Sequence, residues 1–381
     1  MRRLRLLSLL PLLLLVGCPA VLSQPRGEEH IAAMQQGEAA LTHHRDEEAV
    51  TAFATAARTA ERRVDRDEAE FEEAQALERL GRYDEALVLL DRVGNREPNS
   101  RRTARAIYDA ARIRLELLNQ REPAMQGFER VVREHPEDGL ENISIRRLVD
   151  DYEARGDLDG AIALLDRLYG DVGSTRAGDD LLRAKADLQL AKGDRAGARA
   201  TLEKLVAEHP YPYGHSWDNA LMKLAEMDLE DGNPRAAIER YETIVSVNEE
   251  TNLVGSYTLP TMPEAQISIA RIYRDQLSDR DAASRAYDDV GERFPRSTLR
   301  DDAQYEAGVM WLDAHETRRG CRYLSHVVAD FEVGHARRQA IARMRTDCPD
   351  DLPEELRRPE GEQAADAGRA TTPSTTPDAG R

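Results

Sequence analysis

The sequence predicts an all-α protein built from about eight helix hairpins that stack side by side. Three observations lead to this prediction. Small and large apolar residues recur at helical spacing with a repeat of roughly 37 residues, which is long enough for two helices and their turns. Proline closes several of the repeats, and proline cannot continue a helix. Aromatic residues make up only 5% of the 381 residues, a low share for a strand-rich protein.

Residues 67–98 show the repeating unit most clearly. Two amphipathic segments flank Gly81, and Pro98 ends the unit. Glycine suits the left-handed position that often follows a helix, so Gly81, Gly156 and Gly193 are predicted to end first helices. The apolar positions of the unit, which are spaced three or four residues apart within each segment, are Ala74, Leu77, Ala86, Leu90 and Val93.

The same ladder recurs along the chain. A small marker residue opens each predicted second helix, at Ala49, Ala86, Ala124, Ala161, Ala198, Ala237, Ala283 and Gly320. The intervals between markers are 37, 38, 37, 37, 39, 46 and 37 residues. Four residues after the markers stand the large apolar side chains Phe53, Leu90, Phe128, Leu165, Leu202, Tyr241, Tyr287 and Leu324. A hairpin this short cannot bury its apolar face alone, so each one needs a similar neighbour.

This pattern of small residue, large apolar residue and proline resembles the tetratricopeptide repeat (TPR) family. The prolines follow the markers by twelve residues in four units, at Pro98, Pro136, Pro210 and Pro295. The resemblance covers residues 30–348 and implies a right-handed TPR-like superhelical solenoid, with a capping helix at about residues 335–347. The period is slightly longer than the family's repeat of about 34 residues, and the tryptophan of its first helix is absent.

Residues 1–17 resemble a bacterial lipoprotein signal peptide. Arginines precede a leucine-rich run that Pro11 interrupts, and the run is too short for a membrane span. Leu15-Val16-Gly17-Cys18 resembles the lipobox, which implies cleavage before Cys18 and its acylation, for example with palmitate. The alternative is an ordinary signal peptide with an incidental cysteine. Pro19, in place of aspartate, favours the outer membrane by analogy with enteric sorting, facing the periplasm.

Residues 18–29 lack periodicity and are predicted to be a tether, with the Cys18 lipid as the contact with the membrane. The C-terminal segment 349–381 is rich in proline, threonine and acidic residues and has little apolar mass, which predicts a disordered tail. Before it, Phe294-Pro295-x-Ser297 and the residues that follow resemble repeats of periplasmic TPR proteins such as the envelope-assembly lipoprotein BamD and the Tol-associated coordinator CpoB.

Three irregular stretches each leave two interpretations open. His43-His44 could bind a metal, but adjacent side chains on a loop rarely converge, which favours a solvated turn. The linker 208–217 gathers three aromatic residues that form either an apolar plug or a rim that contacts a partner. Residues 248–260 account for the 46-residue interval, and they either contact a partner or cover a gap between repeats.

Charge and motifs exclude several function classes. The net charge of −18 argues against nucleic acid or an anionic membrane surface as a partner. Phosphate-binding glycine loops, HExxH, GxSxG and CxxC patterns are absent from the sequence. We therefore predict a protein that is not an enzyme and that uses no cofactor and no metal.

The sequence favours a protein-protein interaction scaffold whose partners are other envelope proteins or extended peptide segments. The alternative is an assembly factor, similar to BamD or to the TPR pilotins, within an outer-membrane assembly or secretion machine. The pattern sets no oligomeric state. In the family, ligands bind in a concave groove, and its inward positions correspond here to Arg146, Arg147, Asp150, Arg183, Asp187, Met222, Lys223 and Glu226. A solvated wall without a ligand is the other interpretation of these positions.

Two cysteines follow Cys18 in the sequence. Cys321 lies near the start of the last second helix, and Cys348 ends the capping helix, 27 residues later. In a TPR stack, a second helix runs antiparallel to the next helix, so these two ends lie side by side. An exported protein matures in an oxidising compartment, which favours a disulfide. Two buried free thiols are the alternative.

Overall fold

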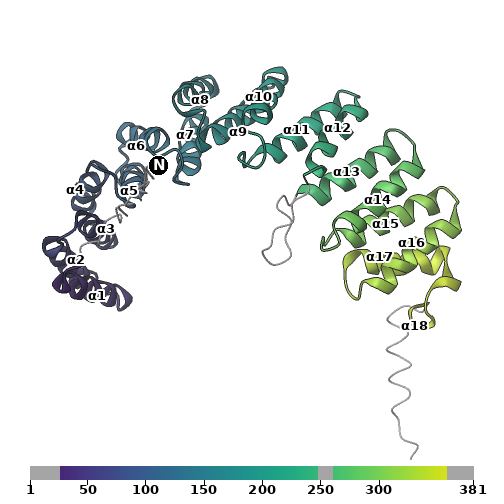
Figure 1. Ribbon diagram of the computed structural model, residues 1–381, viewed down its shortest axis with the longest axis horizontal. Helices are drawn as coiled ribbons and strands as arrows, with labels where there is room; N and C mark the ends of the chain where they lie inside the picture. Colours follow the sequence, from purple (N-terminus) through teal and green to yellow (C-terminus); the bar gives the residue numbers. More distant parts are fainter. Residues whose placement is uncertain (1–25, 248–260, 358–381) are drawn as a thin grey trace, which may run out of the picture. The chain divides into compact units, whose positions relative to one another are not determined.

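The computed structural model describes residues 26–247 and 261–357 (Figure 1), and no β-strand occurs within them. The prediction of an all-α chain of helix hairpins is confirmed. The helices are α1 (Glu28–Thr42), α2 (Asp46–Thr59), α3 (Arg63–Arg79), α4 (Tyr83–Gly94), α5 (Thr103–Glu116), α6 (Arg121–Glu134), α7 (Glu141–Ala154), α8 (Leu158–Val172), α9 (Arg176–Ala191), α10 (Arg195–Glu208), α11 (Trp217–Glu230), α12 (Pro234–Val245), α13 (Thr261–Asp275), α14 (Arg280–Arg293), α15 (Arg300–Asp313), α16 (Thr317–Asp330), α17 (His335–Asp347), the 3₁₀ helix η1 (Pro349–Asp351) and α18 (Glu354–Arg357).

The described residues divide into two compact units, one within 26–144 and the other within 145–247 and 261–357. In the first unit, each helix from α1 to α6 packs against the next one along the chain. Figure 1 shows the first helices α1, α3 and α5 along one side of this unit and the second helices α2, α4 and α6 along the other. This alternation places the odd-numbered helices on a common surface.

The second unit continues the same succession, with each helix from α8 to α17 packed against its neighbour. Helix α17 contacts both α15 and α16, so it closes the last hairpin as the predicted capping helix. No helix in the described part of the chain is long and apolar enough to cross a membrane.

The ladder of small and large residues forms the core. All eight marker residues are buried, and so are the large side chains four residues after them. Close packing explains why small residues are needed: a Cβ atom at Gly37 would lie only 2.5 Å from the ring of Phe53. At the other end of the chain, a Cβ atom at Gly308 would lie 2.6 Å from the side chain of Leu324.

Every hairpin turn has a residue with positive φ at the same place, five positions before the marker. Glycine occupies four of these positions, Gly81, Gly156, Gly193 and Gly232, with φ between 70° and 79°. The other four are His44, Asn119, Ser278 and His315, with φ between 53° and 61°. The glycines signal this conformation in the sequence, whereas histidine and serine do not. His44 therefore has a structural role in its turn.

The ordered C-terminal region is longer than the sequence predicts. The composition predicts a disordered tail over residues 349–381, but η1 and α18 lie within residues 349–357. Leu352 is only 1% exposed and packs with Cys348 and Met344, and Leu356 packs on the same cluster. These two leucines supply apolar surface that the overall composition of the segment conceals. The remainder of the predicted tail, 358–381, lies outside the described residues, as do 248–260, the signal segment and Cys18.

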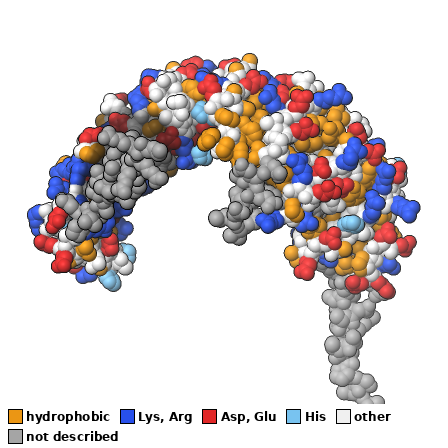
Figure 2. Space-filling view, in the orientation of Figure 1, with side chains coloured by type: hydrophobic (Ala, Val, Ile, Leu, Met, Phe, Trp, Pro, Cys, Tyr) orange, Lys and Arg blue, Asp and Glu red, His pale blue; other side chains and the backbone are white. Residues whose placement is uncertain are grey.

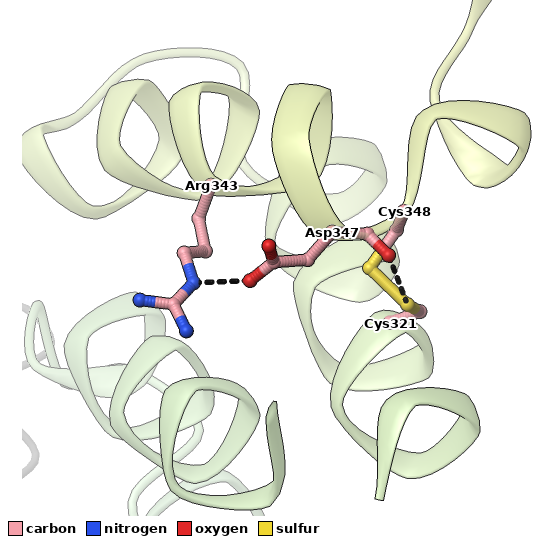
Figure 3. Close-up of a disulfide and its surroundings, with 4 residues drawn as sticks. All are labelled: Cys321, Arg343, Asp347 and Cys348. Carbon is pink, nitrogen blue, oxygen red and sulfur yellow. Dashed lines mark hydrogen bonds and ion pairs between the residues drawn. A yellow bond between two sulfur atoms is a disulfide. The ribbon is translucent and has the colours of Figure 1, made fainter. Parts of the chain in front are cut away.

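Cys321 and Cys348 are joined in a disulfide, with a Cα–Cα distance of 5.7 Å (Figure 3). The bridge links the start of α16 to the residue after α17. Arg343 of α17 donates hydrogen bonds to Asp347 of its own helix and to Asp313 of α15. The capping helix is therefore held by covalent, polar and apolar contacts. Asp351 lies near both sulfur atoms, but sulfurs in a disulfide are not thiolate ligands for a metal.

Candidate interaction surface

The charged residues predicted to line a groove lie at the surface of α9 and α11. Arg183 and Lys223 are at least partly exposed, as are Asp187 and Glu226. The Arg183 guanidinium lies 3.7 Å from Asp187 and 3.3 Å from Asp180, and the Lys223 ammonium lies 2.9 Å from Glu226. These ion pairs form within each helix, which is the weak and easily exchanged kind.

Asp187 connects the charges of the two helices. Burial raises the pKa of the Asp187 carboxyl, while the positive charges of Arg183 and Lys223 oppose that shift. Lys223 belongs to α11, and its charge acts on the Asp187 carboxyl of α9.

The other predicted positions differ in what they can do. Arg146 and Asp150 on α7 are exposed, and Arg147 is half-buried. Met222 is partly buried and packs against the apolar core of the second unit, so its side chain has a structural role. We define the α7–α9–α11 wall as the seven charged positions Arg146, Arg147, Asp150, Arg183, Asp187, Lys223 and Glu226.

The first unit contains a cavity between first helices that is not among the predicted sites. Leu41 of α1, Phe71 and Glu72 of α3, and Arg105 of α5 line this cavity. Arg102, which precedes α5, also lines it, and its guanidinium lies 4.5 Å from the centre of the Phe71 ring. The signal was available, because the inward register counted back from Ala86 falls on Phe71, Glu72 and Gln75.

Charge in this cavity is balanced mainly by Arg102. Its guanidinium donates to Glu72 at 2.8 Å and to Glu68 at 2.6 Å. Burial raises the pKa of Glu72, and the nearby carboxylates of Glu68 and Glu38 add to the rise. Burial also disfavours the charged form of Glu68, but the hydrogen bonds from Arg102 and Arg101 outweigh it and lower the pKa of Glu68. The cavity is therefore built around an internal ion network.

The aromatic linker between α10 and α11 divides into two parts. Trp217 is 7% exposed, and its ring centre lies 6.1 Å from that of Tyr211, which also packs on the core. Tyr213 is 83% exposed. Tyr211 and Trp217 thus match the plug interpretation, whereas Tyr213 is available for contact with a partner.

The family comparison matches three segments of the chain. The model described as "Tetratricopeptide repeat" matches residues 68–100, 105–138 and 181–210, which correspond to hairpins α3–α4, α5–α6 and α9–α10. These segments are tetratricopeptide repeats. Repeats of this kind are protein-interaction modules, and proteins built from them are generally scaffolds without catalytic activity. No curated protein matches the sequence.

Three solved structures that match the chain have low sequence identity to it. A tetratricopeptide repeat protein from Parabacteroides merdae ATCC 43184 is 13% identical, with a TM-score of 0.33, over 74% of this chain and 99% of that one. YrrB, a TPR protein with an unusual peptide-binding site, is 16% identical, with a TM-score of 0.35, over 57% of this chain and 98% of YrrB. The yeast Tom70 is 14% identical, with a TM-score of 0.36, over 79% of this chain and 61% of Tom70.

Proposed function

We propose that the protein is a lipid-anchored scaffold of the bacterial cell envelope, in which the α7–α9–α11 wall holds an extended, mixed-charge peptide segment of a partner protein. The observation that carries this proposal is the set of exposed or half-exposed charges of both signs at the predicted inward positions of α9 and α11, where Lys223 of α11 acts on the carboxyl of Asp187. Both signs of charge are present there, so the partner segment is expected to carry both signs as well.

The ion pairs within the wall are weak enough for a bound peptide to replace them. An exposed pair within one helix contributes only about 0.3–0.5 kcal/mol, so a ligand can replace it at little cost. Arginine can bind a carboxylate through two parallel hydrogen bonds, which adds geometric specificity. Arg146, Arg147 and Arg183 are the three arginines of the wall.

The membrane anchor rests on the sequence Leu15-Val16-Gly17-Cys18. Several acyl chains on one residue would bind a membrane firmly, because each buried methylene contributes about 0.8 kcal/mol. Fractionation of cells that express the Cys18→Ala variant tests this part. We expect the variant to leave the outer-membrane fraction for the soluble fraction, and retention in that fraction would contradict the anchor.

A pull-down from detergent-solubilised envelope tests the wall. We expect the triple variant R146Q/R147Q/R183Q to recover at least fivefold less partner than the unchanged protein. The control is R235Q/R280Q/R338Q, which neutralises three exposed arginines on α12, α14 and α17. Equal recovery by both triple variants would overturn the wall as the binding site.

The composition of the recovered material distinguishes a scaffold from an assembly factor. Several partners in substoichiometric amounts support the scaffold. One integral outer-membrane protein at equal stoichiometry would instead support the assembly-factor role.

A further inference from the structure

Two adjoining cavities run along α16 and together form a groove in the second unit. One lies between α14, α15 and α16, and the other lies over the first half of α16 beside Asp351. Arg322 and His326 line both cavities, so the two are continuous along the helix. We call this surface the α16 groove. Figure 2 shows mixed blue and red side chains over this part of the molecule.

Charges of opposite sign occupy opposite ends of the α16 groove. Asp288, Glu292 and Asp330 line one end, where Arg300 is the only arginine not shared with the other cavity. The other end is lined by Arg318, Arg319 and Arg322, with Asp351 as the acidic residue. Each end thus has an excess of one sign of charge.

The charges at the basic end are largely unneutralised within the chain. Arg318 and Arg322 make no ion pair with any residue that the structure describes, and the guanidinium of Arg322 lies 5.9 Å from the centre of the Tyr323 ring. Arg319 pairs with the exposed Asp281 at 3.2 Å and lies over Trp311. Like charges three or four residues apart on a helix repel each other. The repulsion between Arg318 and Arg322, which are four residues apart, is therefore not offset by an ion pair of either residue in the described chain.

The acidic end of the groove also contains charged residues that make no ion pair with a described residue. Glu292 and Asp330 have no ion pair among the described residues, and both are exposed. Asp288 accepts hydrogen bonds from Tyr323 at 2.9 Å and from Gln304 at 3.3 Å, which are neutral donors. Tyr323 is in turn fixed by Ser284, at 2.7 Å, so this wall of the groove is preorganised.

We propose that the α16 groove is a second interaction site, separate from the wall in the proposed function, and that it binds an extended peptide segment of a partner with a carboxylate-bearing end and a cationic end. The argument is charge complementarity. Arg318 and Arg322 would take the carboxylates, while Glu292 and Asp330 would take the cation. A rise of about 1.5 Å per residue places positions 318 and 330 about 18 Å apart. An extended peptide spans that distance with five or six residues, at about 3.3 Å each.

The probe is the fluorescein-labelled peptide Glu-Glu-Ser-Gly-Ser-Gly-Lys-Lys, measured by fluorescence polarisation with the protein carrying Cys18→Ala and its full C-terminus. A peptide of identical composition with alternating charges is the comparison probe. We expect the separated-charge peptide to bind at least fivefold more tightly than the alternating one. R318Q/R322Q and E292Q/D330N are each expected to weaken its binding at least fivefold. R235Q/R280Q, which neutralises exposed arginines elsewhere, should change it less than twofold.

Three outcomes would overturn the proposal. Unchanged binding by R318Q/R322Q would remove the groove as the site, and equal binding of the two peptides would reduce the effect to net charge. The third outcome concerns the chain's own acidic residues beyond the described part. If the probe binds only after E360Q/E362Q/D366N, then the chain's own C-terminal segment is the occupant, and the partner assignment is wrong. Circular dichroism of each variant checks that its helical content is unchanged.

Discussion

The first unit and the α16 groove treat charged residues in opposite ways. In residues 26–144, every arginine makes at least one hydrogen bond or ion pair. On α16, Arg318 and Arg322 have no ion pair within the described chain. Burial makes pairing necessary for some of the carboxylates in the first unit. Asp67 and Glu70 of α3 are at most 5% exposed, and buried carboxylates must be paired. Exposed charges such as those of Arg318 and Arg322 are solvated by water and can stay unpaired until a ligand binds.

Arg96 is the most sensitive point of the paired region. Its guanidinium contacts Asp67 and donates to Glu70 at 2.6 Å, and it is only 19% exposed. We expect Arg96→Gln to lower the free energy of local unfolding of α3 and α4 by about 3 kcal/mol, because two buried carboxylates lose their shared cation. Amide hydrogen exchange of these helices measures the change.

Arg318→Gln is the matched test in the unpaired region. Its side chain is exposed, so the substitution is expected to change the opening free energy of α16 by less than about 0.5 kcal/mol. If Arg96→Gln lowers the free energy of local unfolding by less than about 1 kcal/mol, or if Arg318→Gln lowers it by more than that, the proposed difference between the two regions is wrong.

The C-terminal region relies on a covalent bond in place of a buried ion network. Replacing both cysteines, as in C321A/C348A, opens a loop whose ends are 27 residues apart. We expect α17 to lose about 2–3 kcal/mol of stability against opening, since the unfolded state gains conformational freedom. Hydrogen exchange in α17 measures the loss, and α3 serves as the internal control. Two titratable thiols in the denatured, non-reduced protein would contradict the bridge itself.

Glu73 shows that even the paired region contains an imperfectly compensated charge. Burial, together with the neighbouring Glu70 carboxylate, raises the pKa of Glu73 to about 7 from 4.5. Between about pH 4.5 and 7, the unfolded chain has released this proton and the folded chain keeps it, so stability falls as pH rises. Above pH 7 the penalty is constant. Below about pH 4.5 it disappears.

Glu73→Gln should therefore stabilise the first unit at pH 8 and not at pH 4. We expect a gain of about 1–2 kcal/mol at pH 8, after allowance for solvent screening of a partly exposed side chain. Hydrogen exchange of α3 at the two pH values gives the difference. Glu85→Gln is the control, because hydrogen bonding by Arg82 lowers the pKa of Glu85. An equal effect of Glu73→Gln at both pH values would exclude titration of Glu73 as the cause.

The sequence predicts the fold through features that repeat, and it misses features that occur once. The buried ladder from Ala49 to Leu324 recurs at a nearly constant interval, so periodicity reveals the hairpins, and the resemblance to the TPR family implies the antiparallel ends that bring Cys321 and Cys348 together. Leu352 escapes notice because a single buried leucine in an acidic segment has no period. Pairing of charges is also invisible, since Arg96 and Arg318 differ in burial and not in residue type.

The eight hairpin turns allow the most detailed comparison, because different residue types adopt the same backbone conformation in them. Gly232 has a φ of 76° and open space around its missing Cβ, so Gly232→Ala tests backbone strain without steric conflict. We expect a loss of about 1 kcal/mol in the α11–α12 hairpin. The reverse change at Ser278 or His315 relieves that strain but adds freedom to the unfolded chain, so the net gain should be at most about 0.5 kcal/mol.

Asn119→Gly separates these two contributions. Asparagine tolerates the left-handed region better than serine or histidine, because its short polar side chain can hydrogen-bond locally. Little strain remains to relieve at Asn119, while the entropic cost of introducing glycine stays the same. We therefore expect Asn119→Gly to be neutral or slightly destabilising where Ser278→Gly and His315→Gly are slightly stabilising. Hydrogen exchange in α5–α6, α13–α14 and α15–α16 measures the three values, and an equal gain at all three turns would show that residue type does not determine the strain.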